Sequence, residues 1–302
     1  MQTRHHGKGR PAVTLLITLS VIAAMLALVG VLFGYVEKAR SEAEFKSALS
    51  EADLLREDLS GVLNKVLSKK PSVDTLSLIY ATPLYLQPRS GGFSVMAQCS
   101  PLLNRLRISW LGKDPEGAYG RHYTVAHRVF ARLTEQAELR DPDYLLELIR
   151  RTLNGENIRY GEGGRLQKKK GIIDRKEFQR LLDDYRFGRD DPNVYRIAWD
   201  DYFIFSDPRE YKGMDAEFST PQLLSALFDI DPTLVKEGFT PGKLKDFLTS
   251  VGANEKEYDW LFEKGPVVAM ECRATYTYRD GGHSLDLNYI SQRIERFGIA
   301  ND

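Results

Sequence analysis

The chain has 302 residues, of which 42% are hydrophobic, and its 42 basic side chains are balanced by 42 acidic ones. Without the first ten residues, which carry three basic side chains and no acidic one, 39 basic residues stand against 42 acidic ones. Nucleic-acid-binding proteins usually present a strongly basic face, so this balance argues against a nucleic-acid partner. The composition indicates a globular protein attached to one unusual apolar stretch.

Residues 11–36 form that stretch and contain no charged side chain. As a helix, 26 residues reach about 39 Å, which exceeds the roughly 30 Å hydrocarbon core of a bilayer. The apolar region of a secretory signal is shorter, about 7–15 residues. We therefore predict a transmembrane helix over residues 11–36. The basic leader, residues 1–10, is expected in the cytoplasm and the rest of the chain on the other side of the membrane.

An amphipathic stalk helix is predicted over residues 37–70. Proline is absent from this range, and apolar side chains recur at intervals of three and four residues between Phe45 and Val66. This spacing places one apolar stripe on a helix. The span and the stripe belong either to one long helix or to two helices separated by a kink at Gly34. Pro71 ends the pattern because it lacks an N–H donor.

The first strands of a small sheet are predicted within residues 71–100. β-Branched and aromatic residues are frequent at 75–80, 84–86 and 93–98, and the turn-forming residues 90–92 precede the last of these segments. We expect each segment to be a strand.

A mostly helical region is predicted over residues 101–265. Its apolar spacing indicates helices at 125–139, 144–153 and 175–185. Asp141 before the second helix and Gly155 after it are typical N-terminal and C-terminal signals.

Further helix starts in this region carry capping residues. Asp174 and Glu177 have the spacing of a capping box. Thr220 and Thr240 are each followed by proline, which suits an N-cap with proline at the first helical position. With a third helix at 254–262, these two starts predict a compact three-helix unit.

Residues 266–302 are predicted to form a C-terminal β-hairpin and a tail. Apolar and polar residues alternate over 268–278, residues 280–282 have turn chemistry, and 285–289 begin the return strand. The hairpin and the early strands are expected to share one sheet. The predicted fold class is therefore α+β, with an N-terminal transmembrane and stalk helix and a small antiparallel sheet that contains a large helical insertion.

The two cysteines, Cys99 and Cys272, both lie in the part beyond the span. In an oxidising compartment they can form one disulfide. Two buried free thiols are the alternative, since free cysteine is often buried.

Motifs of catalysis are absent from the sequence. It contains no G-x-S-x-G elbow, no G-x-x-x-x-G-K-[ST] loop and no H-E-x-x-H pair. We therefore predict that the protein is not an enzyme.

A cluster of oxygen-bearing side chains is the one candidate metal site. It consists of Asp183, Asp184, Asp190, Asp191 and Asn193. Calcium prefers six to eight oxygen ligands, so such a turn is a candidate calcium site. The spacing does not match an EF-hand, and we favour the alternative of a helix that ends in a solvated acidic turn.

The order of these segments resembles the type IV pilin-like superfamily. Its elements are a basic leader, an uncharged span, a long amphipathic extension and strands beyond the membrane. Lys8-Gly9 resembles the end of a leader that prepilin peptidase cleaves, which would place the cut between Gly9 and Arg10. Ordinary pilins have a small β-rich head, whereas this chain has a large helical insertion.

That insertion is similar to the K-type minor pseudopilin of type II secretion systems. The likeness lies in the aspartate-rich turn, the aromatic run Trp199–Phe205 and the segment Phe218–Leu224. After cleavage the fifth residue is Thr14, and the K-type protein likewise lacks the glutamate that ordinary pilins carry there. A mature chain that begins with Arg10-Pro11, and not with a bulky apolar residue, departs from the family.

The resemblance implies a structural role in protein secretion. The protein would be a single-pass component of the bacterial inner membrane, with its N-terminus in the cytoplasm and its bulk in the periplasm, at the tip of a short pseudopilus. Its implied partners are other minor pseudopilins and pseudopilus subunits, the inner-membrane assembly platform, prepilin peptidase and secreted protein substrates. Calcium is an implied cofactor of the helical region. An anchored periplasmic adaptor or sensor outside the pilus machinery is the alternative function.

Overall fold

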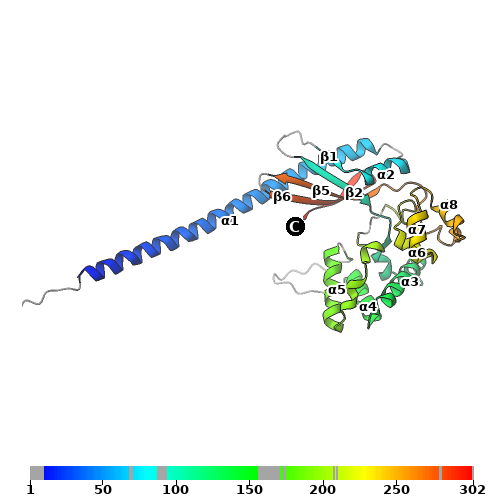
Figure 1. Ribbon diagram of the computed structural model, residues 1–302, viewed down its shortest axis with the longest axis horizontal. Coiled ribbons are helices and arrows are strands. Elements are labelled where there is room, and N and C mark those ends of the chain that lie inside the picture. The colour runs from blue at the N-terminus through cyan, green and yellow to red at the C-terminus, as the bar shows by residue number, and fades with distance from the viewer. Residues whose placement is uncertain are drawn as a thin grey trace, which may run out of the picture. The chain divides into compact units, whose positions relative to one another are not determined.

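The computed structural model describes residues 10–67, 71–86, 94–155, 171–172, 175–206, 208, 210–278 and 281–300. It consists of two compact units, residues 1–57 and residues 58–302. The sheet and every helix after the first belong to the second unit (Figure 1).

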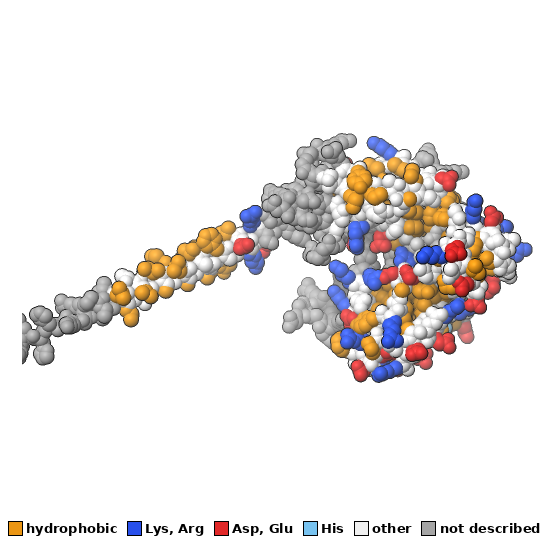
Figure 2. Space-filling model, viewed as in Figure 1, with side chains coloured by type: hydrophobic (Ala, Val, Ile, Leu, Met, Phe, Trp, Pro, Cys, Tyr) orange, Lys and Arg blue, Asp and Glu red, His pale blue; other side chains and the backbone are white. Residues whose placement is uncertain are grey.

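The N-terminal helix α1 (Arg10–Val66) is one α-helix of 57 residues that continues through Gly34. The first of the two sequence interpretations, a single long helix, is thus correct. Residues Leu15–Arg40 have a mean hydropathy of 2.8 and are long and apolar enough to cross a membrane. Hydrophobic side chains cover this part of the helix in Figure 2, and none of them is buried.

A five-stranded antiparallel sheet forms the base of the second unit, with the strand order β1-β2-β5-β6-β7. Its strands are β1 (Leu84–Leu86), β2 (Val95–Pro101), β5 (Ala269–Tyr278), β6 (Gly281–Ile290) and β7 (Arg293–Ala300). The neighbours β2 and β5 are separated in sequence by residues 102–268. The predicted fold class is therefore confirmed: a small antiparallel sheet contains a large helical insertion.

One face of this sheet is apolar and buried, as the alternating pattern requires. Its buried side chains are Val95, Ala97, Cys99, Cys272, Ala274, Leu285, Leu287 and Tyr289. Within the second unit, Leu59 and Leu63 of α1 are also buried, one helical turn apart. The Tyr289 hydroxyl donates a hydrogen bond of 2.5 Å to Asn64. The last turns of α1 therefore lie against the apolar face, which explains the stripe of the predicted stalk helix.

The insertion consists of short helices around a separate apolar core. Its elements are β3 (Leu106–Arg107), η1 (Ile108–Gly112), α3 (Gly120–Gln136), α4 (Pro142–Asn154), α5 (Arg175–Arg189), η2 (Pro192–Arg196), η3 (Trp199–Asp201), β4 (Phe203–Ile204), α6 (Pro221–Phe228), α7 (Pro232–Gly238), α8 (Leu244–Ser250) and η4 (Glu255–Glu257). Strands β3 and β4 pair in parallel. Large aromatic side chains dominate the core, among them Trp110, Phe130, Tyr185 and Trp199.

The capping residues of the sequence set the helix boundaries of α4. The Asp141 side chain accepts a hydrogen bond from the Tyr144 N–H, and Gly155 ends the helix with a φ of 72°. The predicted helices at 125–139 and 175–185 correspond to α3 and α5. Asp174, half of the expected capping box, lies outside the described residues.

Residues 75–80, predicted as a strand, are instead part of helix α2 (Val73–Ala81). Ser72 caps this helix, because its hydroxyl accepts a hydrogen bond from the Thr75 N–H. Leu76 and Ile79 are buried three residues apart, the spacing of a helical face. The β-branched composition of the segment was therefore outweighed by a capping residue and by tertiary packing.

The region after Thr220 contains three helices, α6, α7 and α8, but only the first begins where it was predicted. Helix α6 begins at Pro221 as expected, with Thr220 as its N-cap. Thr240-Pro241 does not start a helix, because Gly242 adopts a φ of 83° and α8 begins only at Leu244. Helix α7, which Asp231 caps, is an addition to the prediction.

Residues 254–262 contain only the short η4 and not a full helix. The backbone after η4 is used elsewhere: the Met214 N–H donates to the Leu261 carbonyl, and the Glu263 N–H donates to the Met214 carbonyl. Residues 258–261 form a turn, in which the Leu261 N–H donates to the Tyr258 carbonyl, and the bonds to Met214 then lead the chain away from a helix.

The predicted C-terminal tail is partly wrong, since it contains the edge strand β7. Ser291 and Gln292 connect β6 to β7 with φ values of 46° and 72°. Two successive positive φ values are typical of the tight turns that join antiparallel strands, in which Asn and Gly are favoured. Because residues 291–292 are Ser and Gln, this turn carries no recognisable signal in the sequence.

Candidate functional site: an apolar helix, a tied sheet and a charged cleft

The apolar part of α1 is the first candidate element for assembly. The small residues Ala23, Ala27, Gly30 and Gly34 follow one another at intervals of four, three and four, which places them along one helix face. A Cβ atom added at either glycine meets nothing within 4 Å in this chain. The glycines are therefore not required by the chain's own packing, and the face permits close approach of another apolar helix.

The two residues expected at a leader cleavage site lie at the start of this helix. Arg10 is the first residue of α1, whereas Gly9 lies outside the described residues. Cleavage between them stays a prediction.

A disulfide joins Cys99 of β2 to Cys272 of β5. The two residues are directly opposite each other in the strand register and are buried in the apolar face. These strands lie directly before and after the insertion. The bond therefore links two points of the chain that are 173 residues apart in sequence. The sheet thus forms a fixed base for the inserted helices.

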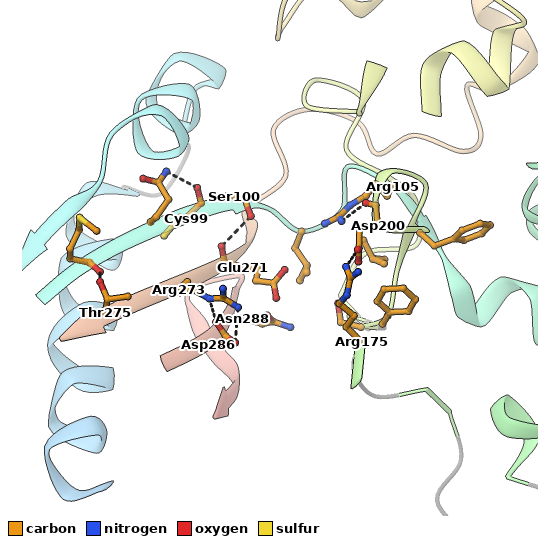
Figure 3. Close-up of a pocket in the computed structure, with 17 residues that line it drawn as sticks. Cys99, Ser100, Arg105, Arg175, Asp200, Glu271, Arg273, Thr275, Asp286 and Asn288 are labelled. Carbon is orange, nitrogen blue, oxygen red and sulfur yellow. Dashed lines mark hydrogen bonds and ion pairs between the residues drawn. The ribbon is translucent and has the colours of Figure 1, made fainter. Parts of the chain in front are cut away.

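A cleft of about 590 Å³ lies between the outer face of the sheet and the insertion (Figure 3). The sheet side is formed by Gln98, Ser100, Glu271, Arg273, Thr275, Asp286 and Asn288, and the opposite side by Arg105, Arg175, Asp200 and Phe205, among others. Alternation along β2 and β5 explains this mostly polar lining, because their apolar residues occupy the other face, with the exception of Met96.

Charges of both signs are held in this cleft. On the sheet, Arg273 donates to both carboxylate oxygens of Asp286, at 2.8 and 3.3 Å. On the opposite side, Arg105 donates to the Asp200 carbonyl at 2.6 Å, and Arg175 forms an ion pair with the Asp200 carboxylate. Burial lowers the pKa of Arg105, while the negative charge of Glu271 acts in the opposite direction.

Paired ions and hydrogen-bonding groups make up most of the polar lining of the cleft. Its lining residues include no histidine, and the one cysteine among them is in the disulfide. The Ser100 hydroxyl donates a hydrogen bond of 3.5 Å to the carbonyl of Glu271, its partner in the strand register. Paired ions and hydrogen-bonding groups suit contacts with a polar partner.

The carboxylates of the acidic turn after α5, the candidate calcium site, have protein partners of different kinds. Asp191 is buried, and its carboxylate accepts hydrogen bonds from the N–H groups of Arg140 and Asn193 and from the Tyr185 hydroxyl, at 2.8–3.1 Å. Burial raises the pKa of Asp191, but these donors outweigh it and bring the pKa below its ordinary value. Its oxygens therefore serve as a structural cap of η2.

The other members of the cluster point to different surroundings. Asp183 accepts a hydrogen bond of 2.6 Å from the Tyr195 hydroxyl, while Asp184 and Asp190 are exposed. No group of three or more His, Cys, Asp or Glu residues in the described part of the chain is placed to hold a metal ion. Calcium binding by this turn stays a prediction, and the turn is solvated only in part because Asp191 is buried.

Elsewhere in the insertion, the side chain of Asp215 is buried and that of Glu217 is half-buried. Asp215 is 1% exposed, and one of its oxygens accepts the Glu217 N–H at 2.9 Å. The second Asp215 oxygen, one Glu217 oxygen and the Tyr80 hydroxyl are buried without a hydrogen-bond partner among the described residues. Burial, together with the charge of Glu217, raises the pKa of Asp215 to about 7. The sequence alone carries no signal that distinguishes these two acids from exposed ones.

Comparison with known proteins rests on the fold alone. No protein-family model matches the chain, and no curated protein sequence matches it. Among solved structures, the chain is similar to one chain of the GspK–GspI–GspJ complex of the type 2 secretion system of enterotoxigenic Escherichia coli, with a TM-score of 0.58. The chain has the fold of a pseudopilin.

The match extends over the helical insertion as well as the sheet. It covers 88% of this chain and 100% of the other, at 11% sequence identity. The uncovered share is far smaller than the insertion of residues 102–268, so most of the insertion takes part in the match. The pseudopilin fold with its large helical insertion is what the resemblance to the K type predicts.

Proposed function

We propose that this protein is a minor pseudopilin of the K type and a structural component of a bacterial type II secretion pseudopilus. The observation that carries the proposal is the position of the insertion between β2 and β5, in a fold that matches a pseudopilin complex over most of its length. The proposal includes no catalytic role.

The N-terminal helix supports both insertion into the membrane and later assembly with other subunits. Its apolar segment suits a single span, with the basic leader in the cytoplasm and the second unit in the periplasm. Because residues 11–36 carry no charged side chain, this part of the helix can leave the bilayer and pack against other apolar helices without burying an ion. Prepilin peptidase would release the leader after Gly9, and the inner-membrane platform would then add the mature protein to the pseudopilus.

The bulk of the insertion supports a position at the tip. A subunit with this added mass on its sheet limits the addition of further subunits beyond it, so other minor pseudopilins are the expected neighbours. Secreted proteins are the expected contacts of the exposed side. Function would then depend on co-assembly and not on turnover of a substrate.

Deletion of the gene tests this role. We expect loss of type II substrates from the medium and their accumulation in the periplasm, with restoration by the full-length chain. As a matched pair, Gly9→Leu should block leader removal and secretion, whereas Lys236→Glu, an exposed position on α7, should leave both unchanged. Normal secretion in the deletion strain would instead favour the anchored adaptor or sensor.

A further inference from the structure

A groove on the insertion, separate from the charged cleft, collects basic and aromatic side chains. It has a volume of about 510 Å³ and lies between the first half of α3 and the segment after η4. Its basic residues are Arg121, Arg128 and Lys256, and Glu257 is its one acidic residue. The lining therefore has a net positive charge, although the net charge of the whole chain is zero.

Aromatic rings hold two of these cations in place. The Arg121 guanidinium lies 5.8 Å from the centre of the Trp260 ring, and Arg128 donates a hydrogen bond of 2.6 Å to the Tyr258 hydroxyl. The Trp260 indole N–H in turn donates to the Glu257 carbonyl at 3.0 Å. Arg128 also forms an ion pair of 3.9 Å with Glu257, within the groove. Because a guanidinium group carries five N–H donors, each arginine can make further hydrogen bonds to a partner.

The start of α3 adds positive potential at one end of the groove. Tyr119, at the N-cap, makes no side-chain capping bond, and the first turn of α3 contains no acidic residue. The N-terminal N–H groups of a helix carry a partial positive charge. Gly120 brings this turn against Pro115, since a Cβ there would collide with the Pro115 carbonyl oxygen. Both residues line the groove.

We infer that this groove binds an extended, carboxylate-rich segment of a protein partner. Arg121 and Lys256 are exposed and match side-chain carboxylates, and the half-buried Trp260 ring offers contact area to the apolar residues between them. A membrane surface fits less well, because none of the lining residues is a strongly exposed hydrophobic side chain that would insert into lipid. The inference stands apart from the proposed function, since it concerns a surface of the insertion and not assembly through α1.

Fluorescence anisotropy with a labelled peptide of alternating Glu and Leu residues tests the inference. The full-length chain in mild detergent should bind this peptide with a saturable curve that weakens steeply when salt is raised, as screened charge contacts do. A peptide with Lys in place of Glu should not bind. Lys256→Glu should weaken the affinity about tenfold, which corresponds to about 1.4 kcal/mol, and Arg121→Glu should do the same.

Matched controls separate the groove from general charge effects. Lys236→Glu changes the net charge equally at an exposed site on α7 and should leave the affinity unchanged. Lys256 is exposed and makes no ring contact in the structure, so its replacement tests the groove without risk to the fold, which circular dichroism verifies. Absence of saturable binding, equal weakening by Lys236→Glu, or preference for anionic lipid vesicles over the peptide would each overturn the inference. The peptide-binding test does not depend on secretion or on leader removal. A negative result would therefore overturn this inference without affecting the proposed function.

Discussion

The disulfide between Cys99 and Cys272 gives the sharpest prediction of stability. Reduction opens a loop with a sequence separation of 173 residues, which contains the entire insertion. A loop of this length restricts the unfolded chain by about 5 kcal/mol on the chain-entropy relation, and measured losses for native disulfides are about 2–5 kcal/mol. We therefore expect reduction to lower the free energy of unfolding by at least about 2 kcal/mol.

Urea unfolding of the full-length chain in mild detergent measures this difference. Two signals are needed: tryptophan fluorescence reports on the insertion, where Trp110 and Trp199 are buried, and far-ultraviolet circular dichroism reports on the whole chain. Oxidised and reduced protein have the same sequence, so any difference in midpoint belongs to the bond. The Cys99→Ala/Cys272→Ala variant is the control and should not respond to reductant.

The opposite result would be equally clear. If the oxidised and reduced chains unfold at the same urea concentration, the bond does not constrain the two halves of the sheet. The idea that the disulfide secures β2 to β5 against the long insertion would then be wrong.

Three further variants test the buried polar groups. Asp191→Ala should cost about 3 kcal/mol, because it removes the acceptor of three hydrogen bonds, and the loss should be the same in millimolar calcium and in EDTA; a loss seen only with calcium would restore the metal site. Asp215→Asn should be more stable than the parent at pH 8 and nearly equal to it at pH 4. The raised pKa of about 7 means that the folded state of the parent loses stability as the pH rises from about 4 to 7, by up to about 4 kcal/mol, and a parallel pH profile of the two proteins would refute this. Tyr289→Phe should cost about 1 kcal/mol by breaking the bond to Asn64, measured by thermal unfolding, and an unchanged midpoint would mean that this contact does not hold α1 to the sheet.

Strong local signals were sufficient to predict much of the fold. The uncharged span predicted a long apolar helix, and Asp141 and Gly155 marked both ends of α4 because capping is decided within a few residues. The alternation over 268–278 likewise predicted a half-buried strand.

The errors arose where distant residues decide the conformation. The helix α2 depends on the burial of Leu76 and Ile79. After η4 the chain makes a turn and then bonds to the backbone of Met214, far away in the sequence, so no helix continues there. The turn at 291–292 has no glycine or asparagine to mark it.

The candidate site was harder to predict than the fold for the same reason. An aspartate that caps a neighbouring element and one that binds a cation look alike in sequence, so Asp191 was assigned to a possible metal site. The difference lies in its donors, since Arg140 and Tyr185 reach it only in the folded chain. The charged cleft combines residues of the sheet with residues of the insertion, and pairing of β2 with β5 brings its sheet side together.

Co-isolation tests the central claim most directly. The tagged full-length chain, expressed at its natural level in its own bacterium, should be recovered from detergent-solubilised membranes together with the other minor pseudopilins of the same type II system. Replacement of Ala27 by Arg in the apolar helix should abolish this recovery while the second unit stays folded, because the substituted face can no longer approach another apolar helix. Recovery of the chain without any pseudopilin would contradict the account and leave a membrane-anchored protein of another kind.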